Sequence, residues 1–128
     1  MNDKSFTFSK DNIKLIDQIL AKYPSEQKAS AVMPLLDLAM RQIGGWLTEQ
    51  AMKKISQIID VPYIRVYEVA TFYSMYNLSP VGKFFIQVCT TTPCMIRGAY
   101  KLVEACKEKI SENESELLDN KNCSWMEV

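Results

Sequence analysis

The first part of the chain repeats apolar residues at three- and four-residue steps, the spacing of one helix face. This pattern predicts a helix after Ser9 that ends at Pro24, and a second from Ser30 that ends at Gly44-Gly45. It predicts a third helix from Thr48 to Ile59 and a fourth from Pro62, although the β-branched and aromatic content of the fourth also suits a strand. The positions that define the four stripes are Ile13, Ile16, Ile19, Leu20, Tyr23, Val32, Leu35, Leu36, Ala39, Met40, Ile43, Met52, Ile55, Ile58, Ile59, Val66, Val69, Ala70 and Tyr73. We expect a small helical bundle that buries these positions.

The pattern changes after Ser79-Pro80-Val81-Gly82, where residues 83–89 alternate as a strand does. A loop follows, and then a helix whose expected inner face carries Ala99, Leu102, Val103, Cys106 and Ile110. Residues 111–122 read as a polar loop and residues 123–128 as a short final strand. The predicted fold class is therefore α+β, with a helical bundle over residues 1–80 and a strand-loop-helix-strand unit over residues 81–128.

Composition removes several classes of function. The 128 residues carry 15 Lys and Arg against 15 Asp and Glu, so there is no basic excess that would suggest nucleic acid as a partner. No apolar stretch approaches the roughly 18 residues of a membrane-spanning helix, and residues 1–8 resemble neither a signal nor a transit peptide. Because the sequence has no His, His-based catalysis and His metal ligands are excluded.

The four cysteines carry the candidate chemistry. Cys89 and Cys94 form a C-x4-C pair between a strand end and a helix start, and without secretory features they read as ligands or redox groups rather than a disulfide. A [2Fe-2S] cluster needs four thiolates, of which this loop would supply two. The Thr-Thr-Thr-Pro spacer would curve round a cluster edge, and amides at the helix start would hydrogen-bond to its sulfides.

Two other metal sites are disfavoured. A plant-type ferredoxin needs a cysteine at position 97, where Arg97 stands, and structural zinc needs a second Cys or His pair. Cys106 reads as a buried core thiol and Cys123 as a structural strand residue, so neither is expected to complete the site. Arg97, expected just inside the helix start, reads equally well as a residue that tunes a cluster or contacts a partner and as an ordinary surface residue.

Aromatic residues gather near the end of the bundle. Tyr67, Phe72, Tyr73 and Tyr76 lie beside Met75, more than four short helices are expected to bury. Aromatic residues and Met are enriched at interface cores, so a surface that faces a partner is one interpretation and core packing is the other.

These motifs closely resemble one family over roughly residues 10–128. The run VYEVATFY at residues 66–73 and the run IQVCTTTPCMIRG at residues 86–98 are similar to the thioredoxin-like 2Fe-2S subunits of respiratory complex I, the E-subunit family of NADH-quinone oxidoreductases and counterparts of mitochondrial flavoprotein 2. Residues 30–39 and 42–47 resemble the helical part of the same family. The resemblance implies a thioredoxin-like ferredoxin domain after the bundle.

The same resemblance implies an electron-transfer function. Cys89 and Cys94 match the first cysteine pair of the family, and a second, C-x3-C pair would follow a strand that resembles residues 124–128. We therefore expect a truncated chain with an incomplete ligand set, which binds the [2Fe-2S] cluster weakly or not at all and is not catalytic alone. The cluster would exchange one electron with the flavin of an NADH- and FMN-binding partner, so FMN and NAD would lie on that partner, beside a large iron-sulfur subunit.

The sequence leaves several alternatives open. The same module serves NAD-linked formate dehydrogenases and hydrogenase diaphorases, and a cofactor-free interaction module is a further alternative. An incomplete sheet would leave the edge of residues 83–88 open, which favours a non-native homodimer or fraying of the second unit. The resemblance places the protein in the cytoplasm, peripheral on the inner face of a bacterial inner membrane, or in the mitochondrial matrix after processing, with no direct membrane insertion.

Overall fold

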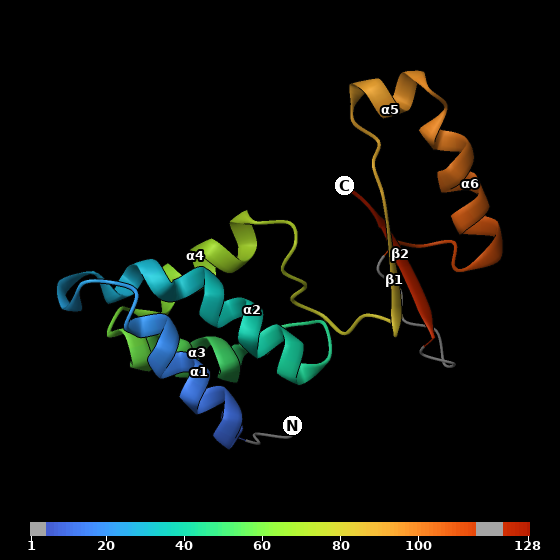
Figure 1. Ribbon diagram of the computed structural model, residues 1–128. Helices are drawn as coiled ribbons and strands as arrows, with labels where there is room; N and C mark the ends of the chain where they lie inside the picture. Colours follow the sequence, from blue (N-terminus) through green and yellow to red (C-terminus); the bar gives the residue numbers. More distant parts are fainter. Residues whose placement is uncertain (1–4, 115–121) are drawn as a thin grey trace. The chain divides into compact units, whose positions relative to one another are not determined.

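A computed structural model describes residues 5–114 and 122–128 of the chain (Figure 1). The chain divides into two compact units, Met1–Ser79 and Pro80–Val128. The first unit contains α1 (Lys10–Leu20), the 3-10 helix η1 (Ser25–Ala31), α2 (Val32–Ile43), α3 (Glu49–Ile59) and α4 (Tyr63–Phe72). The second contains β1 (Phe84–Val88), α5 (Thr92–Ile96), α6 (Ala99–Lys109) and β2 (Cys123–Glu127). The class is α+β, as predicted.

The helices of the first unit begin and end where local chemistry dictates. The Ser9 and Thr48 side chains cap α1 and α3 by accepting hydrogen bonds from backbone amides of the first turn. Gly44 ends α2 at a φ of 108°, a left-handed conformation that costs glycine little. The segment after Pro62 is the helix α4, so the alternative of a strand there is wrong. The sequence pattern did not predict η1, whose seven residues include a non-helical Gln27.

One apolar core holds this unit together. Its fully buried members come mainly from α2, α3 and α4, as the predicted stripes require; they include Leu35, Leu36, Ile55, Val66 and Leu47. Two stripe positions differ from expectation, since Ile13 is 50% exposed and Tyr73 is 38% exposed. Tyr73 lies just past α4, as its extended C-cap, so it does not continue the helix stripe.

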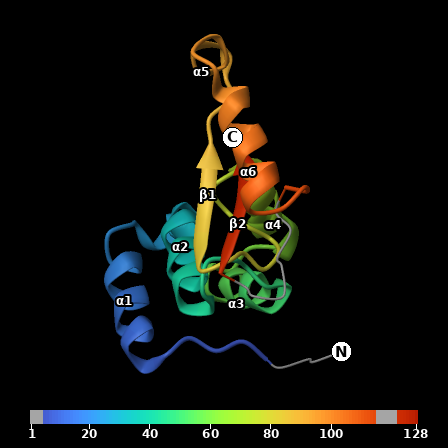
Figure 2. The same cartoon turned by 90° about the vertical axis from the view of Figure 1, so that its right-hand side faces the viewer.

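The second unit is a β-α-β arrangement around two parallel strands. β1 and β2 pair in register from Phe84 with Cys123 to Val88 with Glu127, with α6 on the connection between them (Figure 2). Trp125 of β2 is fully buried against Val88 and Val103, and its Nε1 donates a 2.9 Å hydrogen bond to the Ser111 carbonyl. A parallel pair requires a crossover connection, and α6 supplies it.

Three sequence expectations for this unit need correction. Thr92–Ile96 forms the short helix α5, so the spacer between the cysteines is not simply a loop. Arg97 ends α5 and Gly98 precedes α6, so Arg97 is not inside the start of the longer helix. Leu102 is 61% exposed instead of buried, because the two strands formed by the described residues do not cover the whole apolar stripe of α6. The polar loop predicted for residues 111–122 lies partly outside the described residues, which resume at Asn122.

The backbone just before β1 lies very close to the backbone of β2. The Gly82 amide donates a 2.9 Å hydrogen bond to the buried Ser124 hydroxyl. A Cβ atom at Gly82 would lie 2.7 Å from the carbonyl carbon of Cys123, which is closer than any packed contact. Glycine at position 82 is therefore a requirement of the strand pairing.

No helix in the described part of the chain has the length and apolar content to cross a bilayer.

Gly82→Ala tests whether this close approach requires glycine. The added methyl group must push the backbones of β1 and β2 apart, so we expect a loss of about 1–3 kcal/mol in the free energy of unfolding of the second unit. Guanidinium titration followed by Trp125 fluorescence measures it in a Trp46→Phe background, because the other tryptophan lies in the first unit. Lys83→Ala, at an exposed neighbouring position, is the control, and an equal loss in both variants would contradict the explanation.

Candidate metal centre

The strand end fixes the position of the first candidate ligand. Cys89 directly follows β1, and the backbone on both sides of it bonds to the chain terminus: the Val128 amide donates to the Val88 carbonyl at 2.9 Å, and the Thr90 amide donates to the Val128 carbonyl at 3.2 Å. The ladder therefore continues past the last residue of β1. This pairing holds the Cys89 backbone while its side chain remains exposed.

The second candidate ligand comes from the helix that follows. Cys94 is the third residue of α5, and the Pro93 ring at the start of that helix presets its backbone. Cys89 and Cys94 are both free thiols and both line one cavity of about 840 Å³. The structure thus brings the two predicted residues to the same hollow, without a disulfide between them.

The two thiols have different electrostatic surroundings. Hydrogen bonds lower the pKa of Cys89: the largest contribution comes from the Thr91 hydroxyl, whose oxygen lies 3.1 Å from Sγ, followed by the Thr91 amide and the Cys94 thiol. The pKa of Cys94 is raised, because its proton is engaged by the Cys89 sulfur and burial adds to the effect. Cys89 is consequently the thiol that ionises first, and the thiolate is the form that binds metals.

Thr91 is a candidate site residue that the sequence pattern did not single out. It is the middle member of the run Thr90-Thr91-Thr92, and nothing in the sequence distinguishes the three hydroxyls. A hydroxyl two residues after a strand-end cysteine is close enough to hydrogen-bond back to it, and that spacing is the only signal that could have identified Thr91.

The remaining cysteines occupy other positions. Cys106 is half-buried in α6, packed against the small core of the second unit, and it also lines the cavity of Cys89 and Cys94. It is therefore less buried than the core thiol expected from the sequence. Cys123 is half-buried at the start of β2 and does not line that cavity. Arg97 lines the cavity beside the cysteines.

The donor chemistry fits part of an iron-sulfur site. Cys106 on α6 lines the cavity as well, but Cys89 and Cys94 are the two soft sulfur donors from one loop, which is what a [2Fe-2S] cluster takes from one of its ligand loops. In residues 5–114 and 122–128, no group of three or more His, Cys, Asp or Glu side chains is arranged to hold a metal ion. Cys89 and Cys94 would supply two of the four thiolates that such a cluster needs.

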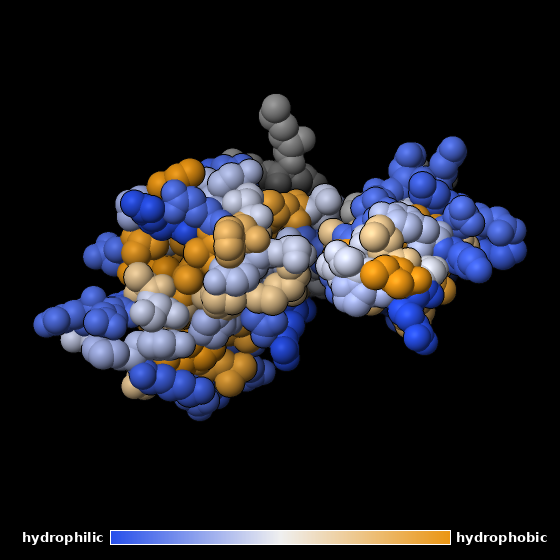
Figure 3. All heavy atoms as spheres, turned by 90° about the horizontal axis from the view of Figure 1, so that it is seen from above, coloured by the Kyte–Doolittle hydropathy of each residue, from blue (hydrophilic) through white to orange (hydrophobic). Residues whose placement is uncertain are grey.

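A second surface feature lies on the first unit, at the end of α4. Four large residues there are exposed: Tyr67, Phe72, Tyr73 and Met75, with Phe72 80% exposed. The Phe72 and Tyr73 rings pack edge to face with 5.0 Å between their centroids, and we call this pair the aromatic patch. Tyr76, expected among these exposed residues, is instead 6% exposed and donates a hydrogen bond from its hydroxyl to the Met33 carbonyl at 3.2 Å. Hydrophobic residues also mark the surface of this unit in Figure 3.

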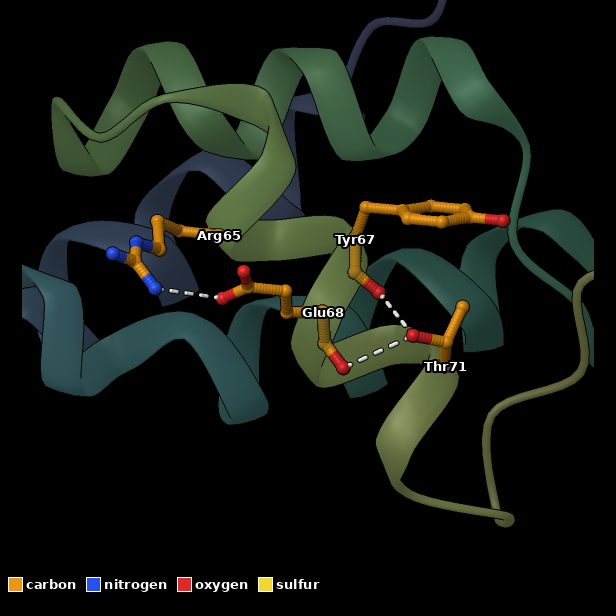
Figure 4. A network of polar contacts seen from close by, with 4 residues as sticks. All are labelled: Arg65, Tyr67, Glu68 and Thr71. Carbon is orange, nitrogen blue, oxygen red and sulfur yellow. Dashed lines mark hydrogen bonds and ion pairs between the residues drawn. The ribbon is translucent and has the colours of Figure 1, made fainter.

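The exposed side of α4 also carries a short polar network. Arg65 forms a 2.9 Å ion pair with Glu68, and the Thr71 hydroxyl donates to the Tyr67 carbonyl at 2.9 Å (Figure 4). These contacts join residues of one helix, at the spacing of neighbouring turns. These contacts hold the side chains of Arg65, Glu68 and Thr71 against α4.

The comparisons with known proteins agree on one family. A family model described as thioredoxin-like [2Fe-2S] ferredoxin matches residues 16–128, which span both units. The E subunit of NADH-quinone oxidoreductase from Rickettsia bellii (strain RML369-C) is 49% identical over 130 aligned residues, covering 100% of this chain and 78% of the relative. The corresponding protein of Rickettsia prowazekii (strain Madrid E) is 46% identical, covering 97% of this chain and 70% of the relative.

A eukaryotic relative extends the match. NADH dehydrogenase [ubiquinone] flavoprotein 2, mitochondrial, of Dictyostelium discoideum is 42% identical over 123 residues, covering 96% of this chain and 50% of that protein. The family resemblance expected from the sequence motifs is confirmed by these matches. The chain belongs to the thioredoxin-like [2Fe-2S] ferredoxin family, among the E subunits of NADH-quinone oxidoreductases.

Proposed function

We propose that this chain is an electron-transfer subunit of an NADH-quinone oxidoreductase, in which Cys89 and Cys94 provide two of the four thiolate ligands of a [2Fe-2S] cluster. The observation that carries the proposal is that both thiols are free and line one cavity at the end of β1. Family membership supports the iron-sulfur cofactor and an electron-transfer role within an oxidoreductase complex. The names of the relatives support the choice of complex.

The chain's own residues hold and orient the ligands. A [2Fe-2S] cluster, when bound, takes up and releases one electron. The strand pairing at Val88 and Thr90 fixes the Cys89 backbone, and the Thr91 hydroxyl stabilises its thiolate. Metal ligation requires deprotonated thiols, so the lowered pKa of Cys89 favours it as the first to bind. No catalytic residue is assigned, because the chain carries electrons and forms no substrate bond.

The partners are part of the same proposal, which the family resemblance supports. We place FMN and NAD on an NADH-binding flavoprotein subunit, which exchanges one electron with this chain, and we place a large iron-sulfur subunit beside it. The aromatic patch supports a docking surface for such a partner, since exposed aromatic and Met side chains are typical of interface cores. The complex would lie peripheral to the membrane, on the cytoplasmic or matrix face.

Cysteine variants in the assembled complex test the ligand assignment. Cys89→Ser and Cys94→Ser should each remove the [2Fe-2S] electron paramagnetic resonance signal that belongs to this subunit after reduction, because a thiolate ligand is lost. Cys123→Ala is the matched control and should keep the signal, since Cys123 does not line the cavity. An unchanged signal in Cys89→Ser, or an equal loss in Cys123→Ala, would exclude the assignment.

A substitution in the aromatic patch tests the docking proposal. Phe72→Ser removes the most exposed ring of the patch, so its affinity for the flavoprotein subunit should fall about tenfold, as expected for losing a buried Phe contact. Measurement is by titration of one purified subunit with the other. Ile13→Ser, at a 50% exposed position on α1, is the control. Equal affinities for Phe72→Ser and the unsubstituted chain would place the partner elsewhere.

A further inference from the structure

The side-chain hydroxyl of Thr91 lies against the sulfur of Cys89. The two atoms are 3.1 Å apart, and either can donate the hydrogen bond while the thiol keeps its proton. In residues 5–114 and 122–128, no other side-chain hydroxyl hydrogen-bonds to this sulfur. A thiol that binds a metal has lost its proton, so the Thr91 hydroxyl is then the only donor that this bond can have.

This hydroxyl is not used to cap the helix that follows it. Thr91 is the N-cap residue of α5, yet its side chain makes no capping hydrogen bond. A capping hydroxyl accepts from the amide of the second or third helical residue, and the second residue of α5 is Pro93, which has no N–H. Removal of the hydroxyl therefore removes a contact with Cys89 and no helix cap.

The backbone on both sides of the hydroxyl is fixed. The Thr90 amide donates to the Val128 carbonyl at 3.2 Å, and the Thr91 carbonyl accepts from the Met95 amide at 2.9 Å. A β-branched side chain also has few accessible rotamers. The donor is thus already in place beside the sulfur, without the entropic cost of ordering a loop.

We propose that the Thr91 hydroxyl raises the reduction potential of the [2Fe-2S] cluster that Cys89 ligates, by donating a hydrogen bond to the Cys89 sulfur. The inference rests on the proposed function, since it takes Cys89 as a ligand. Reduction adds one electron, from the flavoprotein partner or from dithionite in a titration, and the hydroxyl keeps its proton. Because a hydrogen bond to sulfur is stronger when the sulfur carries more negative charge, it favours the reduced form.

The exposure of both side chains limits the size of this effect. Cys89 and Thr91 are exposed, so water can replace part of the hydrogen bond when the hydroxyl is removed. Only the difference in hydrogen-bond strength between the oxidised and reduced forms changes the potential. We therefore expect about a threefold to tenfold change in the redox equilibrium, less than the full strength of a bond to a charged group would give.

A redox titration of the assembled complex with dithionite tests the proposal, with the electron paramagnetic resonance signal of this subunit as the readout. Thr91→Val keeps the shape of the side chain and removes the hydroxyl. At a fixed potential it should lower the ratio of reduced to oxidised cluster about threefold to tenfold, a midpoint potential more negative by about 28 to 59 mV for one electron. Thr91→Ser keeps a hydroxyl and should restore most of the potential.

Thr92→Val is the matched control. It removes the next hydroxyl of the same run, also at an exposed position, and should leave the potential unchanged. Thr91→Ala replaces Thr91→Val if the latter does not retain the signal. An unchanged potential without the Thr91 hydroxyl, an equal shift in Thr92→Val, or no restoration by Thr91→Ser would overturn the role of Thr91 and leave the ligand assignment intact. A signal that persists in Cys89→Ser would overturn both proposals.

Discussion

The parallel pairing of β1 with β2 is the constraint on which the candidate site depends. It is fixed at one end by the Gly82–Ser124 hydrogen bond and in the middle by the fully buried Trp125. At the other end, bonds to Val128 hold the backbone on both sides of Cys89. Because the pairing positions this strand end, α5 can present Cys94 to the same cavity. The position of the cysteine loop thus depends on strand pairing and not on the loop sequence alone.

Local signals in the sequence identified most of the secondary structure. Ser9, Thr48 and Gly44 cap helices where the pattern predicted, and the helix from Pro62 formed despite its β-branched residues. The failures concern burial and short elements. Leu102 belongs to an apolar stripe but is exposed, because stripe periodicity does not reveal how wide a sheet is available to cover it. The helix α5 is five residues long, too short for periodicity to show.

The sequence pattern pointed to the residue types of the candidate site but not to its electrostatics. A C-x4-C pair between strand and helix pointed to Cys89 and Cys94. The contact of Thr91 with Cys89 depends on a hydrogen bond, and the sequence does not show which of three consecutive threonines makes it. The asymmetry that follows, with the pKa of Cys89 lowered and that of Cys94 raised, arises from the Thr91 hydrogen bonds to Cys89 and from the hydrogen bond that the two thiols share. Burial of Cys106 was also not predictable from the sequence: it lies on an apolar helix face, but that face borders the cavity.

Binding of phenylarsine oxide to the metal-free chain tests most directly whether the fold presents both thiols together. The trivalent arsenic atom forms bonds to the sulfur atoms of two neighbouring thiols, whose protons leave with the arsenic-bound oxygen as water, and fragment mass spectrometry identifies the bridged pair. The account predicts one arsenical per chain across Cys89 and Cys94, bound about tenfold more tightly by the folded chain than in guanidinium, because the thiols are preorganised. Equal affinity in both conditions, or a bridge from Cys94 to Cys106, would contradict it.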